Sequence, residues 1–190
     1  IFDQTLDDFQ FNAFTGAAFT LANAGETNVQ GVEIDALYFP TDNLSLGFAA
    51  TFLDPVYESF PLSASGDLSG QEVAGIADTS ISLSATYNWT SGDYDGFIRA
   101  DYQHEADTRI SDDPNLTAAL EAVGNSTREV NLVNISAGIA KGNYEFTVWG
   151  RNVFNDEYLI SAFPSVAQPG SVSGYPNQPA TYGVTLRVKM

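Results

Sequence analysis

The chain of 190 residues carries 24 acidic and 7 basic side chains, so its formal net charge is −17. A surface this acidic repels a phosphate backbone, which excludes nucleic acid as an expected partner. The chain has no cysteine, which excludes disulfides and thiolate metal sites. It also lacks the run of about eighteen apolar residues that a transmembrane helix needs.

The first quarter of the chain predicts β-strands. An extended stretch covers 1–14, and a turn is expected at Thr15-Gly16. Apolar and polar residues then alternate over 32–38 and over 44–52, which is the period of a strand with two different faces. Pro40 begins a tight polar turn between these two strands.

The same alternation continues to the last residue. Further strands are expected at 80–89, 97–105, 131–140, 144–151 and 180–190. In the segment between the second and third of these, Asp113 and Pro114 have the pattern of a helix N-cap followed by a first-turn proline, so a short helix is expected there.

The connections between strands differ in length in a regular way. Tight turns at 40–43, 90–95 and 141–143 alternate with long segments at 54–78, 106–129 and 155–179. Short turns at one end and long loops at the other are typical of outer-membrane barrels, whose periplasmic turns are short. We therefore predict an all-β fold, an antiparallel transmembrane β-barrel, with the three long segments facing outward.

Two alternatives remain open from these patterns. Eight strands are enough to close a complete small barrel, and a soluble extracytoplasmic β-sandwich would also alternate. If the chain is a fragment of a wider barrel, its eight or so strands should form an open, curved sheet whose first and last strands do not pair.

Three motifs carry a resemblance to a known family. They read N-A-G-E-T-N-V-Q-G-V-E-I-D-A-L-Y-F-P-T-D-N-L-S-L near the start, W-G-R-N-V-F-N-D-E-Y at 149–158, and S-G-Y-P-N-Q-P-A-T-Y-G-V-T-L-R-V-K-M at the end. In this order they resemble the TonB-dependent outer-membrane receptors. The positions that match the family's motifs are Gly31, Glu33, Asn152, Phe154 and Tyr158.

The resemblance implies that residues 1–190 form the C-terminal part of a receptor barrel, with the plug domain and the upstream strands lying outside this sequence. It implies residence in the cell outer membrane and import of a scarce, large solute of the iron–siderophore, cobalamin or oligosaccharide class, with energy delivered by TonB. The implied partners are outer-membrane lipid and lipopolysaccharide, the plug domain and the TonB complex, the barrel-assembly machinery at the last strand, and the solute.

Charged residues on the polar faces of the strands are the candidate site residues. They are Glu33, Asp35, Arg99, Asp101, Glu145, Arg151 and Arg187. The simpler interpretation is cross-strand pairing in a wet lumen. The more specific hypothesis is that some of them contact the plug or line the path of the solute.

No motif indicates catalysis, a metal or a cofactor, and we expect no enzyme. His104 is the only histidine, and without a G-x-S-x-G element it is expected at the outer membrane interface, in step with Tyr102, rather than in a catalytic triad. The acidic pairs Asp112-Asp113 and Asp156-Glu157 lack the spacing of a calcium loop, so we interpret them as solvated loop charges or partners of ions that bridge lipopolysaccharide.

Overall fold

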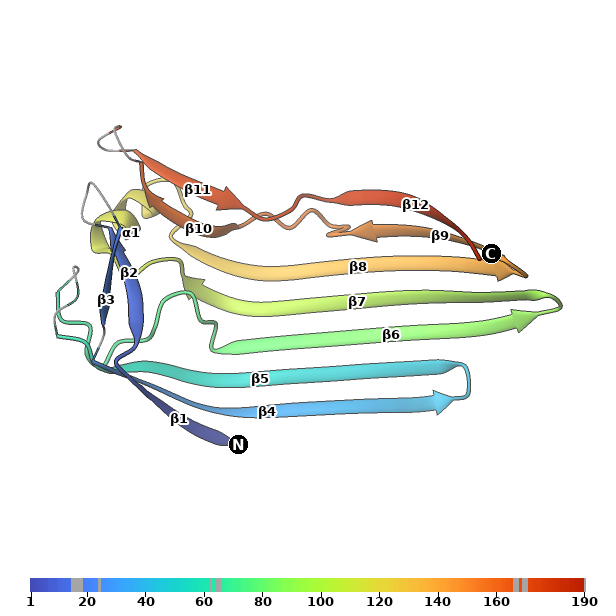
Figure 1. Cartoon of the computed structure of the whole chain (residues 1–190), viewed down its shortest axis with the longest axis horizontal. Coiled ribbons are helices and arrows are strands. Elements are labelled where there is room, and N and C mark those ends of the chain that lie inside the picture. The colour runs from blue at the N-terminus through green and yellow to red at the C-terminus, as the bar shows by residue number, and fades with distance from the viewer. Residues whose placement is uncertain are drawn as a thin grey trace.

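The structure is a computed structural model that describes residues 1–14, 19–23, 25–61, 63, 66–165, 168 and 171–189. Its main element is one antiparallel sheet of eight strands (Figure 1). In spatial order these are β1 (Phe2–Asp7), β4 (Glu26–Thr41), β5 (Leu44–Ser59), β6 (Thr79–Ser91), β7 (Tyr94–Arg109), β8 (Thr127–Lys141), β9 (Tyr144–Arg151) and β12 (Thr181–Val188).

The sheet is open, because β1 and β12 lie at opposite edges and do not pair with each other. This confirms the prediction of an open antiparallel sheet of about eight strands. The strands form one sheet instead of two packed ones, so the sandwich alternative does not describe this fold. The expected turn at Thr15-Gly16 and the end of the last strand at Met190 lie outside the described residues.

Two small hairpins and one helix accompany the main sheet. Strand β2 (Gln10–Phe14) pairs with β3 (Phe19–Asn23), and β10 (Leu159–Pro164) pairs with β11 (Val172–Pro176). Helix α1 (Pro114–Glu121) begins where predicted, with the Asp113 carboxylate accepting hydrogen bonds from the N–H groups of Asn115 and Leu116. No helix among the described residues has the length and apolar character needed to cross a membrane.

The connections are sorted by length, as the sequence predicts. The turns β4–β5, β6–β7 and β8–β9 contain two residues each and lie at one end of the sheet, whereas the hairpins, α1 and the long connections lie at the other end (Figure 1). We call these the turn end and the loop end. Gly92 and Gly142 open two of the turns at φ values of 59° and 56°, a conformation that tight hairpins require and glycine adopts readily.

Several strands are longer than the alternation predicts. Strand β5 continues to Ser59 and β7 to Arg109, and the third long segment contains the β10–β11 hairpin. Backbone pairing persists past the point where apolar residues stop, because polar side chains do not prevent a strand from forming its ladder of hydrogen bonds.

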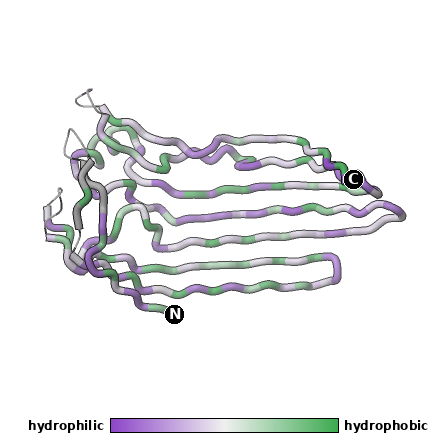
Figure 2. The backbone as a smooth tube through the Cα atoms, viewed as in Figure 1, coloured by the Kyte–Doolittle hydropathy of each residue, from purple (hydrophilic) through white to green (hydrophobic). Residues whose placement is uncertain are grey.

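The two faces of the main sheet have opposite character, and the residues alternate accordingly along β4 to β8 in Figure 2. Paired residues share a face, so the strand register assigns each side chain. The outer face carries an apolar band that includes Ile34, Phe48, Leu83, Ile98, Ile135, Val148 and Val184. The inner face carries mainly Ser, Thr, Gly, Asn and charged residues, including all seven candidate site residues.

The apolar band runs obliquely across the sheet. It ends at Val32 on β4, where Gln30 follows, and at Tyr182 on β12, where the strand begins. The strand pairing connects Tyr182 to Tyr38 on β4 through six strand-to-strand steps. Tyr38 lies six residues along β4 from Val32, where the band ends. The band therefore shifts by about one residue, or ~3.3 Å, per strand spacing of ~4.8 Å, which corresponds to a tilt of roughly 35°. This tilt is in the range of transmembrane barrels.

Aromatic rings cover glycines on neighbouring strands and thereby close gaps in a wall one sheet thick. Trp89 lies over Gly96 on the outer face, where an added Cβ would stand 2.3 Å from the ring. Trp149 lies over Gly183 on the inner face, where the corresponding distance is 2.4 Å. A side chain at either glycine would displace the ring.

An apolar core lies at the loop end of the molecule. Tyr57, Phe60, Leu68 and Val73 form a buried cluster, with Phe9 packed against it. The connection after β5 folds back to build it, as the hydrogen bonds from Tyr57 N–H to Gln71 O (3.0 Å) and from Val73 N–H to Pro55 O (3.0 Å) show. The wall itself exposes its apolar side chains, as a surface in contact with lipid does.

We predict that an arginine is far more costly on the outer face than on the inner face. Leu83→Arg places a charge in the apolar band and should lower the free energy of unfolding of the membrane-embedded protein by about 2–4 kcal/mol. Ser82→Arg, on the same strand but the opposite face, is the matched control and should cost far less. Denaturant titration of the two variants in lipid measures the difference, and equal costs would contradict the assignment of the faces.

Candidate functional site

The inner face holds charged side chains in pairs. Arg99 lies on β7. Its Nε donates to Asp101 Oδ2 at 2.9 Å, and its Nη2 donates to Asp101 Oδ1. Its Nη1 donates to Thr86 Oγ1 on β6 at 3.3 Å. Arg187 on β12 donates to both oxygens of its cross-strand partner Glu145 at 3.2 Å. Four of the seven candidates are thus paired, Arg187 with Glu145 across two strands and Arg99 with Asp101 along one strand.

Two carboxylates on this face remain unpaired. Glu33 and Asp35 are two residues apart on β4, both exposed on the inner face, and neither forms a hydrogen bond or ion pair with another described residue. Arg151, in contrast, places its guanidinium 5.3 Å from the centre of the Trp149 ring, in a cation–π contact. The inner face therefore offers surplus negative charge at β4.

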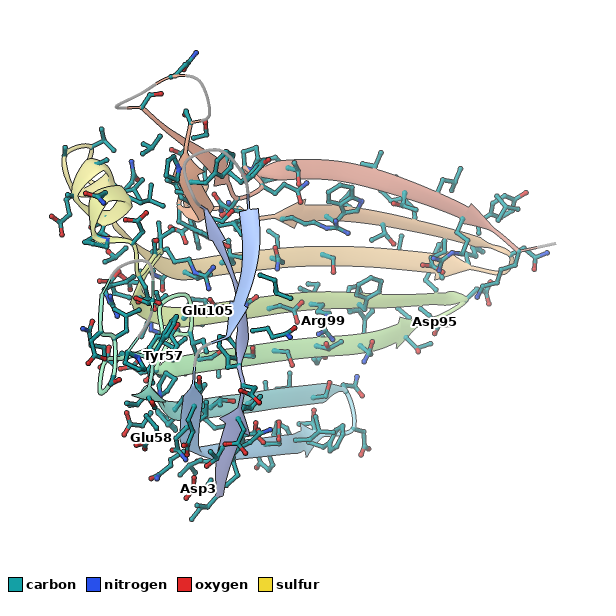
Figure 3. The ribbon with its side chains drawn as sticks, turned by 60° about the vertical axis from the view of Figure 1, so that its left-hand side comes forward. Asp3, Tyr57, Glu58, Asp95, Arg99 and Glu105 are labelled. Atoms are coloured by element: carbon teal, nitrogen blue, oxygen red, sulfur yellow. The ribbon has the colours of Figure 1, made fainter. Side chains whose placement is uncertain are left out.

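A shallow hollow of about 680 Å³ extends across the middle of the inner face. Small residues such as Gly47, Ala49 and Ser82 line it, together with Asp35 and the Arg99–Asp101 pair. Along β7, Glu105, Arg99 and Asp95 follow one another from the loop end to the turn end (Figure 3). Such a surface can accept polar groups of a large ligand or of another domain. The described residues contain no cluster of three or more potential metal ligands.

The family-motif residue Asn152, which directly follows β9, is buried and forms several hydrogen bonds. It is 4% exposed and has a left-handed φ of 48°. Its Nδ2 donates to Asp156 O (2.9 Å) and Gln178 O (3.0 Å), and its Oδ1 accepts from Asp156 N–H (2.8 Å). Asparagine suits this position because it tolerates left-handed backbone better than most residues. The motif therefore joins the end of β9 to the segment that leads into β12.

A second asparagine completes this junction. Two hydrogen bonds join Asn177 and Tyr158: the Asn177 N–H donates to Tyr158 O at 3.0 Å, and the Tyr158 N–H donates to the side-chain Oδ1 of Asn177 at 3.1 Å. Burial, followed by the negative charge of Glu105, raises the pKa of the Tyr158 phenol. Phe154, another motif position, is 77% exposed and has no packing role in the described structure. Gly31 lies beneath Phe2 and Leu53, where a Cβ would meet both side chains within 2.8 Å.

Arg109 and Asp112 tie two long connections together at the loop end. The Arg109 guanidinium lies 3.1 Å from Asp112 Oδ1 and donates to Glu72 O at 2.7 Å. The Asp112 carboxylate also accepts from the buried Tyr57 hydroxyl at 3.1 Å. The segment after β5 is thus held against the end of β7.

Arg128 makes the corresponding link to the third connection. It pairs with Glu105 at 3.2 Å and reaches the carbonyls of Gly75 and Ile160, each at 3.4 Å. Sequence reasoning did not select Arg109 or Arg128, and it interpreted Asp112 as a solvated loop charge or a partner of bridging ions. Apart from the Arg109–Asp112 pair, which is three residues apart, the partners of these side chains lie 23 to 55 residues away. These side chains meet only once the strands are paired, and the pairing of β7 with β8 is irregular between Glu105 and Thr108.

An open, tilted antiparallel sheet with an apolar outer face and a charged inner face defines a segment of transmembrane barrel wall. Residues 1–155 match the profile of the family described as TonB dependent receptor-like, beta-barrel. The chain therefore belongs to the TonB-dependent receptor β-barrel family. A comparison with curated proteins finds no match.

Solved receptors have the same fold. The ferric yersiniabactin uptake receptor FyuA from Yersinia pestis matches 89% of this chain with a TM-score of 0.70 at 14% identity. The ferric-catecholate import receptor Fiu from E. coli K12 matches 98% with a TM-score of 0.67 at 17% identity. The ferric preacinetobactin receptor BauA from Acinetobacter baumannii matches 98% with a TM-score of 0.62 at 15% identity. The chain spans about a quarter of each, namely 24%, 24% and 25%.

We predict that Asn152→Ala loosens the junction between β9 and β12. The change removes three hydrogen bonds and places alanine at a positive φ, so unfolding of this region should become easier by about 3 kcal/mol. Asn125→Ala, which removes a single exposed local bond, is the control and should cost below about 0.5 kcal/mol. Hydrogen exchange at the amides of Asp156 and Asn177 measures the effect. Similar exchange in the two variants would refute the role of Asn152.

Proposed function

We propose that this chain forms part of the barrel wall of an outer-membrane receptor that imports a scarce, large solute with energy delivered by TonB. The observation that carries the proposal is the polar inner face on an open sheet. A wall of this kind suits a wide lumen, because its charged side chains need water or a polar partner. Residues 1–190 would be the C-terminal part of the barrel, and strands and a plug domain elsewhere in the receptor would complete it.

Among solute classes, an iron–siderophore complex has the most support. The three solved receptors above are receptors for ferric yersiniabactin, ferric preacinetobactin and ferric catecholates. At identities of 14–17% this likeness supports the class without selecting a chelate. Cobalamin or an oligosaccharide remains the second candidate, since the polar hollow of the inner face does not itself distinguish the solutes.

The partners follow from the same proposal. The unpaired Glu33 and Asp35 and the polar hollow would face the plug or the moving solute. The apolar outer band would contact membrane lipid, and the loop end would meet lipopolysaccharide. The last strand, β12, would be presented to the barrel-assembly machinery.

Uptake of a radioactive iron chelate tests the function directly. Cells that carry the intact receptor should accumulate the chelate, and they should lose this ability when either the receptor or TonB is deleted. Expression of the intact receptor in the receptor deletion strain should restore it. Uptake that continues at the same rate without TonB would contradict the proposal and would favour passive diffusion through an open pore.

The proposed orientation has a separate test. In intact cells, a membrane-impermeant maleimide should label a cysteine at Ser171, near the tip of the β10–β11 hairpin, and should not label one at Asn143 in the β8–β9 turn. Residues 1–190 contain no cysteine, and replacing any cysteine elsewhere in the receptor by serine makes the label report one site. Labelling of Asn143→Cys alone would reverse the orientation.

A further inference from the structure

His104 lies on the outer face of the sheet and points away from the lumen. It follows Tyr102 by two residues on β7, so the two side chains share a face, and it lies at the loop-end border of the apolar band. Its partner in the strand pairing is Asn131 on β8. The rings of Tyr102 and His104 stack with centroids 6.4 Å apart. Both side chains contact one acceptor, Asn131 Oδ1, at 2.8 Å from the tyrosine hydroxyl and 3.0 Å from His104 Nδ1.

The hydrogen bonds of Asn131 determine which imidazole nitrogen carries the proton. Asn131 Nδ2 donates to Glu129 Oε1 at 3.1 Å, which orients Oδ1 toward Tyr102 and His104. Because an amide oxygen only accepts, Nδ1 of His104 must donate to it. The neutral imidazole therefore keeps Nε2 as an acceptor. No described residue donates a hydrogen bond to Nε2.

An apolar hollow of about 420 Å³ adjoins this group on the outer face. Alanines 85 and 100 form its floor, because their small side chains stand between the larger Leu83, Tyr102 and Phe48. Tyr102 belongs both to the hollow and to the polar group, so the two are continuous. The hollow is also continuous with the apolar band, the surface that meets lipid.

The charges near this site restrict what can bind. Asn131 is bonded to two carboxylates, through its side chain to Glu129 and through its backbone N–H to Asp156 at 2.7 Å. None of the arginines and lysines forms a bond with Tyr102, His104 or Asn131. A phosphate group placed directly on His104 would meet negative charge, whereas an uncharged hydroxyl would donate to Nε2 without repulsion.

We propose that this hollow and His104 bind one membrane amphiphile that carries an uncharged hydroxyl group. The acyl chain occupies the hollow over Ala85 and Ala100, and a headgroup hydroxyl donates to His104 Nε2. The inference rests on the proposed function only in that the outer face must contact lipid. It places a specific lipid on the wall of the receptor, at the border of the band.

Native mass spectrometry of the delipidated, intact receptor in detergent tests this site with two matched probes. Monoolein carries glycerol hydroxyls, whereas methyl oleate has the same chain and no hydroxyl donor. The unaltered protein should bind one monoolein about five- to tenfold more tightly than methyl oleate, the effect of one hydrogen bond. His104→Phe keeps an aromatic ring but removes the acceptor, and it should bind the two probes equally.

A second set of variants tests whether the hollow itself is needed, by filling it with a larger side chain. Ala100→Phe should abolish binding of both probes at this site. Ala137→Phe is the matched control, an outward alanine on β8 that lines a neighbouring outer-face hollow, shared with Ala100, but does not line the hollow beside Tyr102, and it should leave binding there unchanged. Unfolding midpoints of the variants show whether each remains folded.

Two results would overturn the proposal. One is equal binding of monoolein and methyl oleate by the unaltered protein, which requires no variant to fold. The other is equal loss of binding in Ala100→Phe and Ala137→Phe, which would indicate annular lipid without a defined site. Neither measurement depends on transport, so a failure here leaves the proposed uptake function standing, and a failure of uptake leaves this site standing.

Discussion

Backbone hydrogen bonding in a hydrocarbon environment is the constraint on which this structure depends. No water is available there, so each N–H and C=O of a strand must pair with a neighbouring strand. Strands β4 to β9 have a neighbour on both sides, but β1 and β12 pair on one side only. In the receptor that we propose, other strands satisfy these two edges.

A wall of one sheet has no interior, and this explains where the other interactions lie. The wall is stabilised by its ladder of hydrogen bonds, by rings lying over glycines and by the contact of its outer face with lipid. The residues that pack as in a soluble protein are found at the loop end, around Tyr57 and Leu120. There the two arginines Arg109 and Arg128 hold the long connections against one another and against the ends of β7 and β8.

The sequence predicts the wall well because every part of it is periodic. Alternation assigns the two faces correctly, as the pairing of Arg187 with Glu145 and of Arg99 with Asp101 shows. Alternation also places His104 on the outer face in step with Tyr102, as the register shows, while its position at the membrane interface stays a prediction. The loop end is different. Its contacts are between aperiodic residues such as Tyr57 and Asp112, 55 positions apart, and no local pattern connects them. The motif around Asn152 was visible as a resemblance, but its role as a buried hydrogen-bond centre required the positions of Asp156 and Gln178.

The central claim is that β7 crosses the membrane with one face to lipid and the other to a polar lumen. Spin labels on single cysteines at 98 to 103 in the intact receptor test this most directly. Residues 1–190 contain no native cysteine, and any cysteine elsewhere in the receptor is replaced by serine. Collisions with oxygen, which concentrates in lipid, should peak at 98, 100 and 102, and collisions with a water-soluble nickel complex should peak at 99, 101 and 103. Oxygen and nickel accessibilities that do not alternate along these six positions would contradict the account.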